Sequence, residues 1–124
     1  MKFMMMVKAG KDFEDGKPHS PELGEAIGRI TEEMRQKGIL VGIGGLTPSS
    51  AGSRVKVKGG KLTVIDGPFT ETKELIGGYA IMEVPSMEEA VELARRFMQI
   101  HADVMGPSYE GELEIRPLAV FDQA

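Results

Sequence analysis

The chain of 124 residues contains no cysteine, and this absence removes several kinds of chemistry. Disulfide scaffolds, thiol nucleophiles and thiolate metal sites are all excluded. Histidine is scarce too, because only His19 and His101 occur and their spacing fits no metal-ligand motif. We therefore expect no metal and no cofactor.

Long apolar runs and a surplus of positive charge are also missing. The apolar opening is interrupted at Lys8, far too early for a signal-peptide core or a membrane span. The net charge of −4 argues against nucleic-acid or anionic-membrane binding as the main role. We expect a cytoplasmic protein with neither nucleic-acid nor membrane partners.

The composition that remains is that of an ordinary globular protein. Apolar residues make up 41% and charged residues 27% of the chain, which is typical of this class. The length suits a single domain with a real core, spanning 1–124. We interpret the nine methionines as fillers of irregular gaps in that core.

The apolar pattern predicts four strands and two helices. Ser20 followed by Pro21 is typical of a helix start, and Gly38 is typical of a helix end. The second helix begins at the capping box Ser86-Met87-Glu88-Glu89, and its apolar spacing continues to His101. The expected strands are 3–7, 39–46, 75–84 and 112–116, and the expected loops are 9–19, 47–53 and 102–111.

The best hairpin signal lies between the second and third of these strands. Arg54-Val55-Lys56-Val57-Lys58 alternates strictly, and Gly59-Gly60 then makes a two-residue turn into Lys61-Leu62-Thr63-Val64-Ile65. The basic side chains of its first strand share one face. This face fits either an anion-binding surface or a solvated surface whose charges discourage edge pairing. We favour the solvated surface, because no aromatic residues are interleaved for nucleic-acid stacking.

Without the hairpin insertion at about 54–65, the element order is two strand-helix-strand units. This order predicts an α+β, ferredoxin-like fold, in which an antiparallel sheet carries both helices on one face. Strands 3–7 and 75–84 are apolar on both alternating faces, so the face opposite the helices needs a cover. The chain has no third helix to supply it. We therefore predict a homodimer in which a second copy packs sheet to sheet.

The least ordinary local chemistry lies at Asp66-Gly67-Pro68-Phe69-Thr70-Glu71-Thr72-Lys73-Glu74. An aspartate at a turn usually accepts a hydrogen bond from the N–H two residues later, but Pro68 has no N–H. The Asp66 carboxylate must therefore bind the Phe69 N–H, a more distant cation or a ligand. Local chemistry alone favours a well-capped surface turn over a functional site, with Thr70 as the cap.

This nine-residue segment closely resembles the signature of the YCII-related proteins of the DGPF type. The likeness extends over roughly the whole chain up to Leu118. The sequence departs from the family at Thr70, where alanine is common, and in 97–109, where a shorter, proline-rich connection is usual. The other segments that look like the family are Lys2-Phe3-Met4, Leu46-Thr47-Pro48-Ser49-Ser50, Gly59-Gly60-Lys61, Leu75-Ile76-Gly77-Gly78-Tyr79, Ser86-Met87-Glu88-Glu89-Ala90 and Glu112-Leu113-Glu114-Ile115-Arg116.

The resemblance implies a ferredoxin-like fold that dimerises sheet to sheet into an α/β barrel. Wider relatives with this fold include small monooxygenases, isomerases, haem-dependent enzymes and proteins without known activity. A His–Asp pair has been proposed for some related proteins, but no such pair can be matched residue by residue here. Analogy at the level of the fold does not settle function.

Three residues are candidate catalytic groups: Asp66, Tyr79 and His101. Asp66 would act as general base or acid on a small organic molecule in a cleft, with Tyr79 or His101 assisting. His101 continues the apolar stripe of its helix, so a core or helix C-terminal position fits it better than catalysis. The candidate ligand-binding residues are Arg54, Phe69 and Lys73, whose two cations would hold an anionic ligand or simply neutralise Asp66.

Three functions remain open. The chain is an enzyme acting on a small organic molecule, a non-catalytic ligand-binding or regulatory module, or a structural homodimer in which the Asp66 turn only supports the fold. The sequence favours the first two together over the third, and it does not separate an enzyme from a binder.

Overall fold

The main sheet has four antiparallel strands in the order β2-β5-β1-β6. A computed structural model describes residues 1–70 and 74–119 of the chain. Its α+β architecture and strand order are consistent with the predicted ferredoxin-like fold. The strands are β1 (Lys2–Lys8), β2 (Leu40–Gly45), β5 (Ile76–Glu83) and β6 (Leu113–Pro117).

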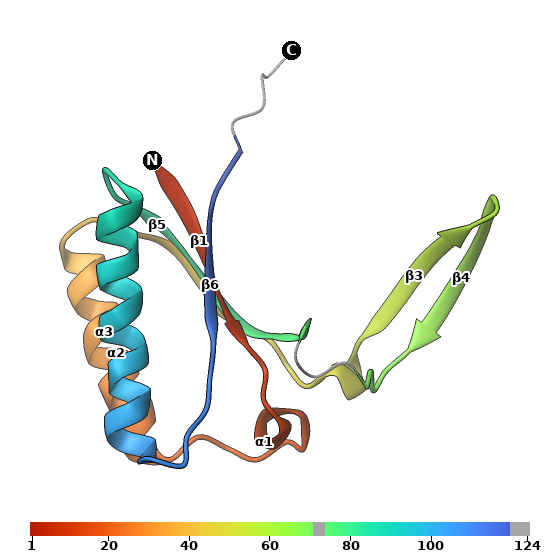
Figure 1. The fold of residues 1–124 in the computed structure, drawn as a ribbon, viewed down its shortest axis with the longest axis horizontal. Coiled ribbons are helices and arrows are strands. Elements are labelled where there is room, and N and C mark those ends of the chain that lie inside the picture. The colour runs from red at the N-terminus through yellow and green to blue at the C-terminus, as the bar shows by residue number, and fades with distance from the viewer. Residues whose placement is uncertain (71–73, 120–124) are drawn as a thin grey trace.

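Two long helices, α2 (Pro21–Gln36) and α3 (Met87–Met105), lie side by side on one face of this sheet (Figure 1). Both begin as predicted: the Ser20 hydroxyl accepts a hydrogen bond from the Leu23 N–H at 3.2 Å, and the Ser86 hydroxyl accepts one from the Glu89 N–H at 3.3 Å. The buried stripe of α2 faces the sheet and consists of Leu23, Ala26, Ile30 and Met34.

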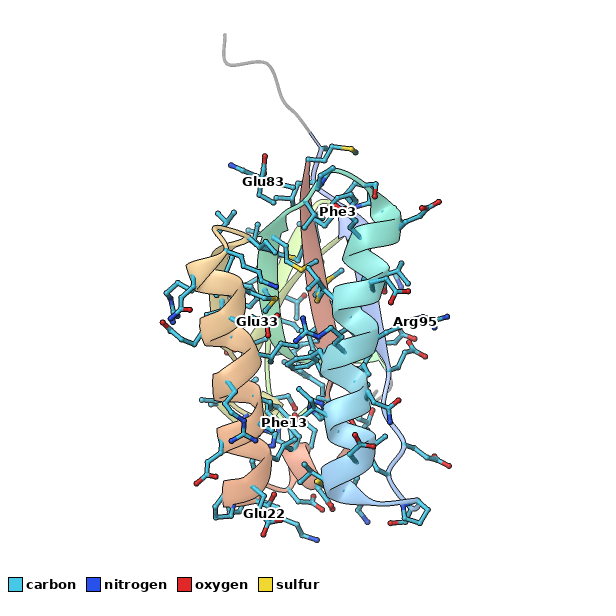
Figure 2. The ribbon with its side chains drawn as sticks, turned by 90° about the vertical axis from the view of Figure 1, so that its left-hand side faces the viewer. Phe3, Phe13, Glu22, Glu33, Glu83 and Arg95 are labelled. Carbon is cyan, nitrogen blue, oxygen red and sulfur yellow. The ribbon has the colours of Figure 1, made fainter. Side chains whose placement is uncertain are left out.

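The densest part of the core fills one end of the layer between helices and sheet. Phe3 and Met82 are almost completely buried there. Figure 2 shows Phe3 at this end, whereas Phe13 lies toward the opposite end of the layer. Methionines do contribute to the core, as predicted. The buried cluster consists of Phe3, Met5, Met34, Met82, Val84, Ala90 and Ala94.

The predicted hairpin forms a separate two-stranded sheet, made of β3 (Ser53–Lys58) and β4 (Lys61–Asp66). Gly59 and Gly60 connect the strands with φ angles of 56° and 78°, which only glycine adopts at no steric cost. The hairpin extends away from the main sheet, on the side opposite the two long helices (Figure 1).

Two of the expected loops contain short helices. A four-residue helix, α1 (Lys11–Glu14), lies in the first, and a 3₁₀ turn, η1 (Ser49–Ala51), lies in the second. Neither is long enough to show an apolar period, and a contact described below holds them together. The expectation that the third loop begins at Ala102 was wrong, because α3 continues to Met105 and ends at Gly106 (φ 88°).

No helix in the described part of the chain combines the length and the apolar character needed to cross a membrane.

Candidate functional site

The Asp66 carboxylate has a partner inside the hairpin. Its Oδ1 accepts a hydrogen bond from the Ser53 hydroxyl at 2.8 Å, directly across the base of the two strands. The Ser53 hydroxyl was not among the three predicted partners, and the Phe69 N–H, which was one of them, donates to the Ser49 hydroxyl at 2.9 Å. The register of a two-residue hairpin turn pairs residue 53 with residue 66, so the sequence did contain the signal for the Ser53 contact.

Ser49 joins the Asp66–Phe69 turn to helix α1. The Glu14 carboxylate accepts hydrogen bonds from the Ser49 backbone N–H, at 2.8 Å, and from the Ser49 hydroxyl. Gly67 packs so closely that a Cβ atom there would lie 1.7 Å from the Ser49 carbonyl oxygen. The turn is therefore fixed by contacts to two other segments, which the sequence did not indicate.

Two of the predicted ligand-binding residues contact each other. The guanidinium carbon of Arg54 lies 4.0 Å from the centroid of the Phe69 ring, a cation–π arrangement. This contact attaches the first hairpin strand to the turn that follows the second. The third residue, Lys73, lies outside the described residues.

A large cavity lies elsewhere, in the half of the helix–sheet layer that the dense core does not fill. Its volume is about 1430 Å³. The walls come from α2, α3, the segment around α1, and the sheet. The apolar side chains among them are Met5, Val7, Phe13, Leu23, Ile27, Met34, Ile43, Leu93, Phe97, Met105 and Leu113.

His101 is a wall residue of this cavity, although only 5% of its surface is exposed. Its Nδ1 lies 2.9 Å from the Phe97 carbonyl oxygen. A carbonyl oxygen can only accept, so Nδ1 carries the proton and a neutral ring leaves Nε2 with a free lone pair. No buried side-chain nitrogen or oxygen lacks a partner among the described residues, so Nε2 keeps some exposed surface.

Two aromatic rings flank the His101 imidazole. The ring centroids of Phe97 and Tyr109 lie 4.7 Å and 5.7 Å from it. Burial raises the pKa of the Tyr109 phenol above its usual value, because the phenolate is poorly solvated there. Tyr109 thus keeps its proton and offers the cavity an O–H group. Nothing in the sequence pattern singled it out.

Tyr79, the second predicted catalytic residue, also borders the cavity, but its side chain shares with Met6 the face of the sheet opposite the helices. Its ring lies across Gly44 on the neighbouring strand, so closely that a Cβ atom at Gly44 would be 2.6 Å from the ring edge. Gly44 in β2 therefore has a steric reason, because any side chain there would collide with the Tyr79 ring.

The candidate residues thus separate into two groups. Tyr79 and His101 line the cavity, together with His19, which the sequence pattern did not favour. Asp66, Arg54 and Phe69 belong to the packed turn at the hairpin base and are not part of the cavity wall. In the described ranges, no three His, Asp or Glu residues cluster as a metal site would require.

Comparisons with known proteins give a family match over most of the chain. The model of the family described as YCII-related domain matches residues 1–106. An uncharacterized protein of Rhizobium meliloti (strain 1021) is 29% identical over 106 residues, which is 82% of this chain and 81% of that protein.

Proposed function

The chain belongs to the YCII-related domain family, and on that premise we propose that it binds a small organic molecule in the cavity between its helices and its sheet. One observation carries the proposal: the His101 imidazole, which the Phe97 carbonyl orients through Nδ1, is a buried residue of the cavity wall. An apolar pocket with a few well-placed polar groups is the usual form of a small-molecule site.

The polar groups of the wall suit proton transfer. The Nε2 of His101 would accept a proton from a bound ligand or, once protonated, return it. The neutral Tyr109 hydroxyl would donate a hydrogen bond beside it. In this proposal His101 is the acid–base group, whereas Asp66 supports the hairpin base through Ser53.

The charges around the cavity favour a neutral or cationic ligand. Acidic residues outnumber basic ones in the wall, and both lysines are paired: Lys8 with Glu114 at 3.4 Å and Lys17 with Asp12 at 3.3 Å. An anionic ligand would instead be expected near Arg54, at the base of the hairpin. The charged wall residues are Lys8, Lys17, Asp12, Glu74, Glu110 and Glu112.

A thermal-melting screen with neutral, cationic and anionic small organic molecules tests the proposal. A true ligand raises the melting temperature in proportion to its affinity and concentration. We expect His101→Gln to lower the affinity for that ligand by about tenfold or more. Asp66→Asn should leave the affinity unchanged. If Asp66→Asn abolishes binding and His101→Gln does not, the binding site lies at the hairpin base instead. Turnover of the ligand would separate an enzyme from a binder.

We also propose that two copies pack through the sheet face opposite the helices. On the two central strands this face carries the paired residues Met6 and Tyr79, and Met4 and Ile81, because side chains alternate along each strand. Met6→Lys should then shift the protein to monomer in sedimentation velocity, whereas Gln99→Lys on the exposed side of α3 should not. A wild-type monomer at micromolar concentration would contradict the dimer.

The alternative function is a homodimeric module without catalysis. The hydrogen bonds from Ser53 to Asp66 and from Ser49 to Glu14 favour it, because they give the Asp66–Phe69 turn a purely structural role. A screen without any melting shift, together with a lowered melting temperature in Asp66→Asn, would support this module over a ligand-binding protein.

A further inference from the structure

The hairpin carries an apolar face that no other described residue covers. In its register Val55 lies opposite Val64, and Val57 lies opposite Leu62, so all four side chains share one face. Their exposed fractions are between 65% and 73%. Isolated apolar side chains on a surface need no explanation, but four contiguous ones on a projecting element do.

A two-stranded hairpin is at best marginally stable in water without packing against another surface. The base of this hairpin is nevertheless held firmly, by the bond from Ser53 to Asp66 and by the Gly67 N–H, which donates to the Gly52 carbonyl at 2.8 Å. The hairpin therefore combines a fixed base with an exposed apolar face, which suits an arm (residues 53–66) that packs on a partner.

We propose that this apolar face packs on the main body of a second copy of the chain, and that each copy reaches across to the other. The inference extends the proposed homodimer and rests on it. The hairpin extends on the side opposite the long helices, which is the side where the second copy would lie (Figure 1). Two-fold symmetry makes the exchange of arms reciprocal.

Charge favours a second copy over other partners. Residues 53–66 contain four basic residues and one acidic residue, a net charge of +3. Because the whole chain has −4, the remainder carries −7, so a basic arm meets an acidic body when two copies associate. The basic side chains of Lys56, Lys58 and Lys61 lie on the face opposite the valines and leave the apolar contact free of charge.

The absence of cysteine allows a direct test by photo-cross-linking. Val57→Cys, labelled with a benzophenone maleimide, places the probe on the apolar face, and Lys56→Cys places it on the opposite face of the same strand. Mixing ¹⁵N-labelled and unlabelled protein identifies peptides joined between copies. We expect several-fold more covalent dimer from position 57, mapped to residues outside the hairpin. Equal yields from both positions would overturn the proposal.

A matched pair of charge substitutions provides a second test. Leu62→Lys and Thr63→Lys add the same charge to adjacent positions on opposite faces of β4. The first should raise the dimer dissociation constant by about tenfold or more, because it buries an unpaired ammonium in the contact. The second should change it little. Sedimentation equilibrium measures both, and an unaltered constant for Leu62→Lys would refute the arm.

The experiments distinguish the proposed arm contact from the proposed sheet-face dimer. If Met6→Lys gives monomers while position 57 yields no cross-link between copies, the sheet-face dimer stands and the arm is wrong. If the wild-type protein is itself a monomer at micromolar concentration, both are wrong.

Discussion

Glu14 on α1 and Ser49 on η1, 35 positions apart in the chain, are joined through both the backbone N–H and the hydroxyl of the serine. The same hydroxyl accepts the Phe69 N–H, so one serine connects three segments. The Asp66–Phe69 signature turn therefore keeps its place through a carboxylate far away in sequence. This relationship gives the turn a clear structural role, because it fixes the base of the hairpin.

Removing the Glu14 carboxylate should loosen that base. Glu14→Ala leaves the Ser49 N–H without its partner, and we expect a loss of about 1–3 kcal/mol in the free energy of unfolding. Urea titration measures it. Asp12→Ala, on the same short helix, removes only an exposed ion pair to Lys17 and should cost less than ~1 kcal/mol. Equal effects would contradict the role given to Glu14.

Gly67 should tolerate no side chain. Gly67→Ala would place Cβ at 1.7 Å from the Ser49 carbonyl oxygen, so the backbone must move, and we expect a loss of roughly 3 kcal/mol or more. The matched control is Gly28→Ala on α2, where a Cβ meets nothing within 4 Å. That substitution should stabilise the helix by about 1 kcal/mol.

Gly44 should control the position of the Tyr79 ring. Gly44→Ala puts Cβ within 2.7 Å of that ring, which must swing away from β2. The chain has no tryptophan and two tyrosines, so tyrosine fluorescence reports the movement directly. Gly45→Ala, whose Cβ would meet nothing within 4 Å, should leave the spectrum unaltered.

The pair of Glu33 and Arg96 should make stability depend on pH in the acid range. Arg96 donates two hydrogen bonds to the Glu33 carboxylate, at 2.6 and 3.0 Å, and Lys37 adds one at 3.3 Å. These contacts lower the pKa of Glu33 from 4.5 to about 2.

A folded-state pKa below the unfolded value gives a stabilisation that is complete above pH 4.5 and disappears as pH falls toward 2. The difference in unfolding free energy between the wild type and Glu33→Gln should therefore shrink over that range. Arg96→Gln should remove most of the same pH dependence. A difference that stays constant from pH 6 to pH 2 would contradict this assignment.

The Tyr109 phenol should ionise at a higher pH than an exposed tyrosine. Because burial raises its pKa above 10, ultraviolet titration of the folded protein should contain a component above that value, absent in Tyr109→Phe. The raised folded-state value also means that stability falls as pH rises through it. A ligand filling the cavity beside His101 should delay this ionisation further.

Much of the fold could be predicted from local patterns. The helix starts at Ser20 and Ser86 and the hairpin turn at Gly59-Gly60 depend on residues within a few positions of one another, and each was confirmed. The order of elements then favoured the observed strand order. Helix α1 was missed because four residues show no period, and its contact with Ser49 is not local.

Less of the candidate site could be predicted from local sequence patterns. The turn after Asp66 was correctly identified as unusual, but its partners Ser49 and Glu14 lie far away in the chain. Tyr79 and His101 were named as candidates, yet only the structure brings them into the wall of one cavity, with Tyr109 beside the histidine.

By itself, the sequence determined the two long helices, the strands, the family and the absence of thiol chemistry, because each follows from residue types at short spacing. The tertiary structure alone decided that the core fills one end of the helix–sheet layer, that a cavity occupies the other, and that the hairpin stands uncovered. Those features depend on how distant segments share volume, and no local spacing encodes that sharing.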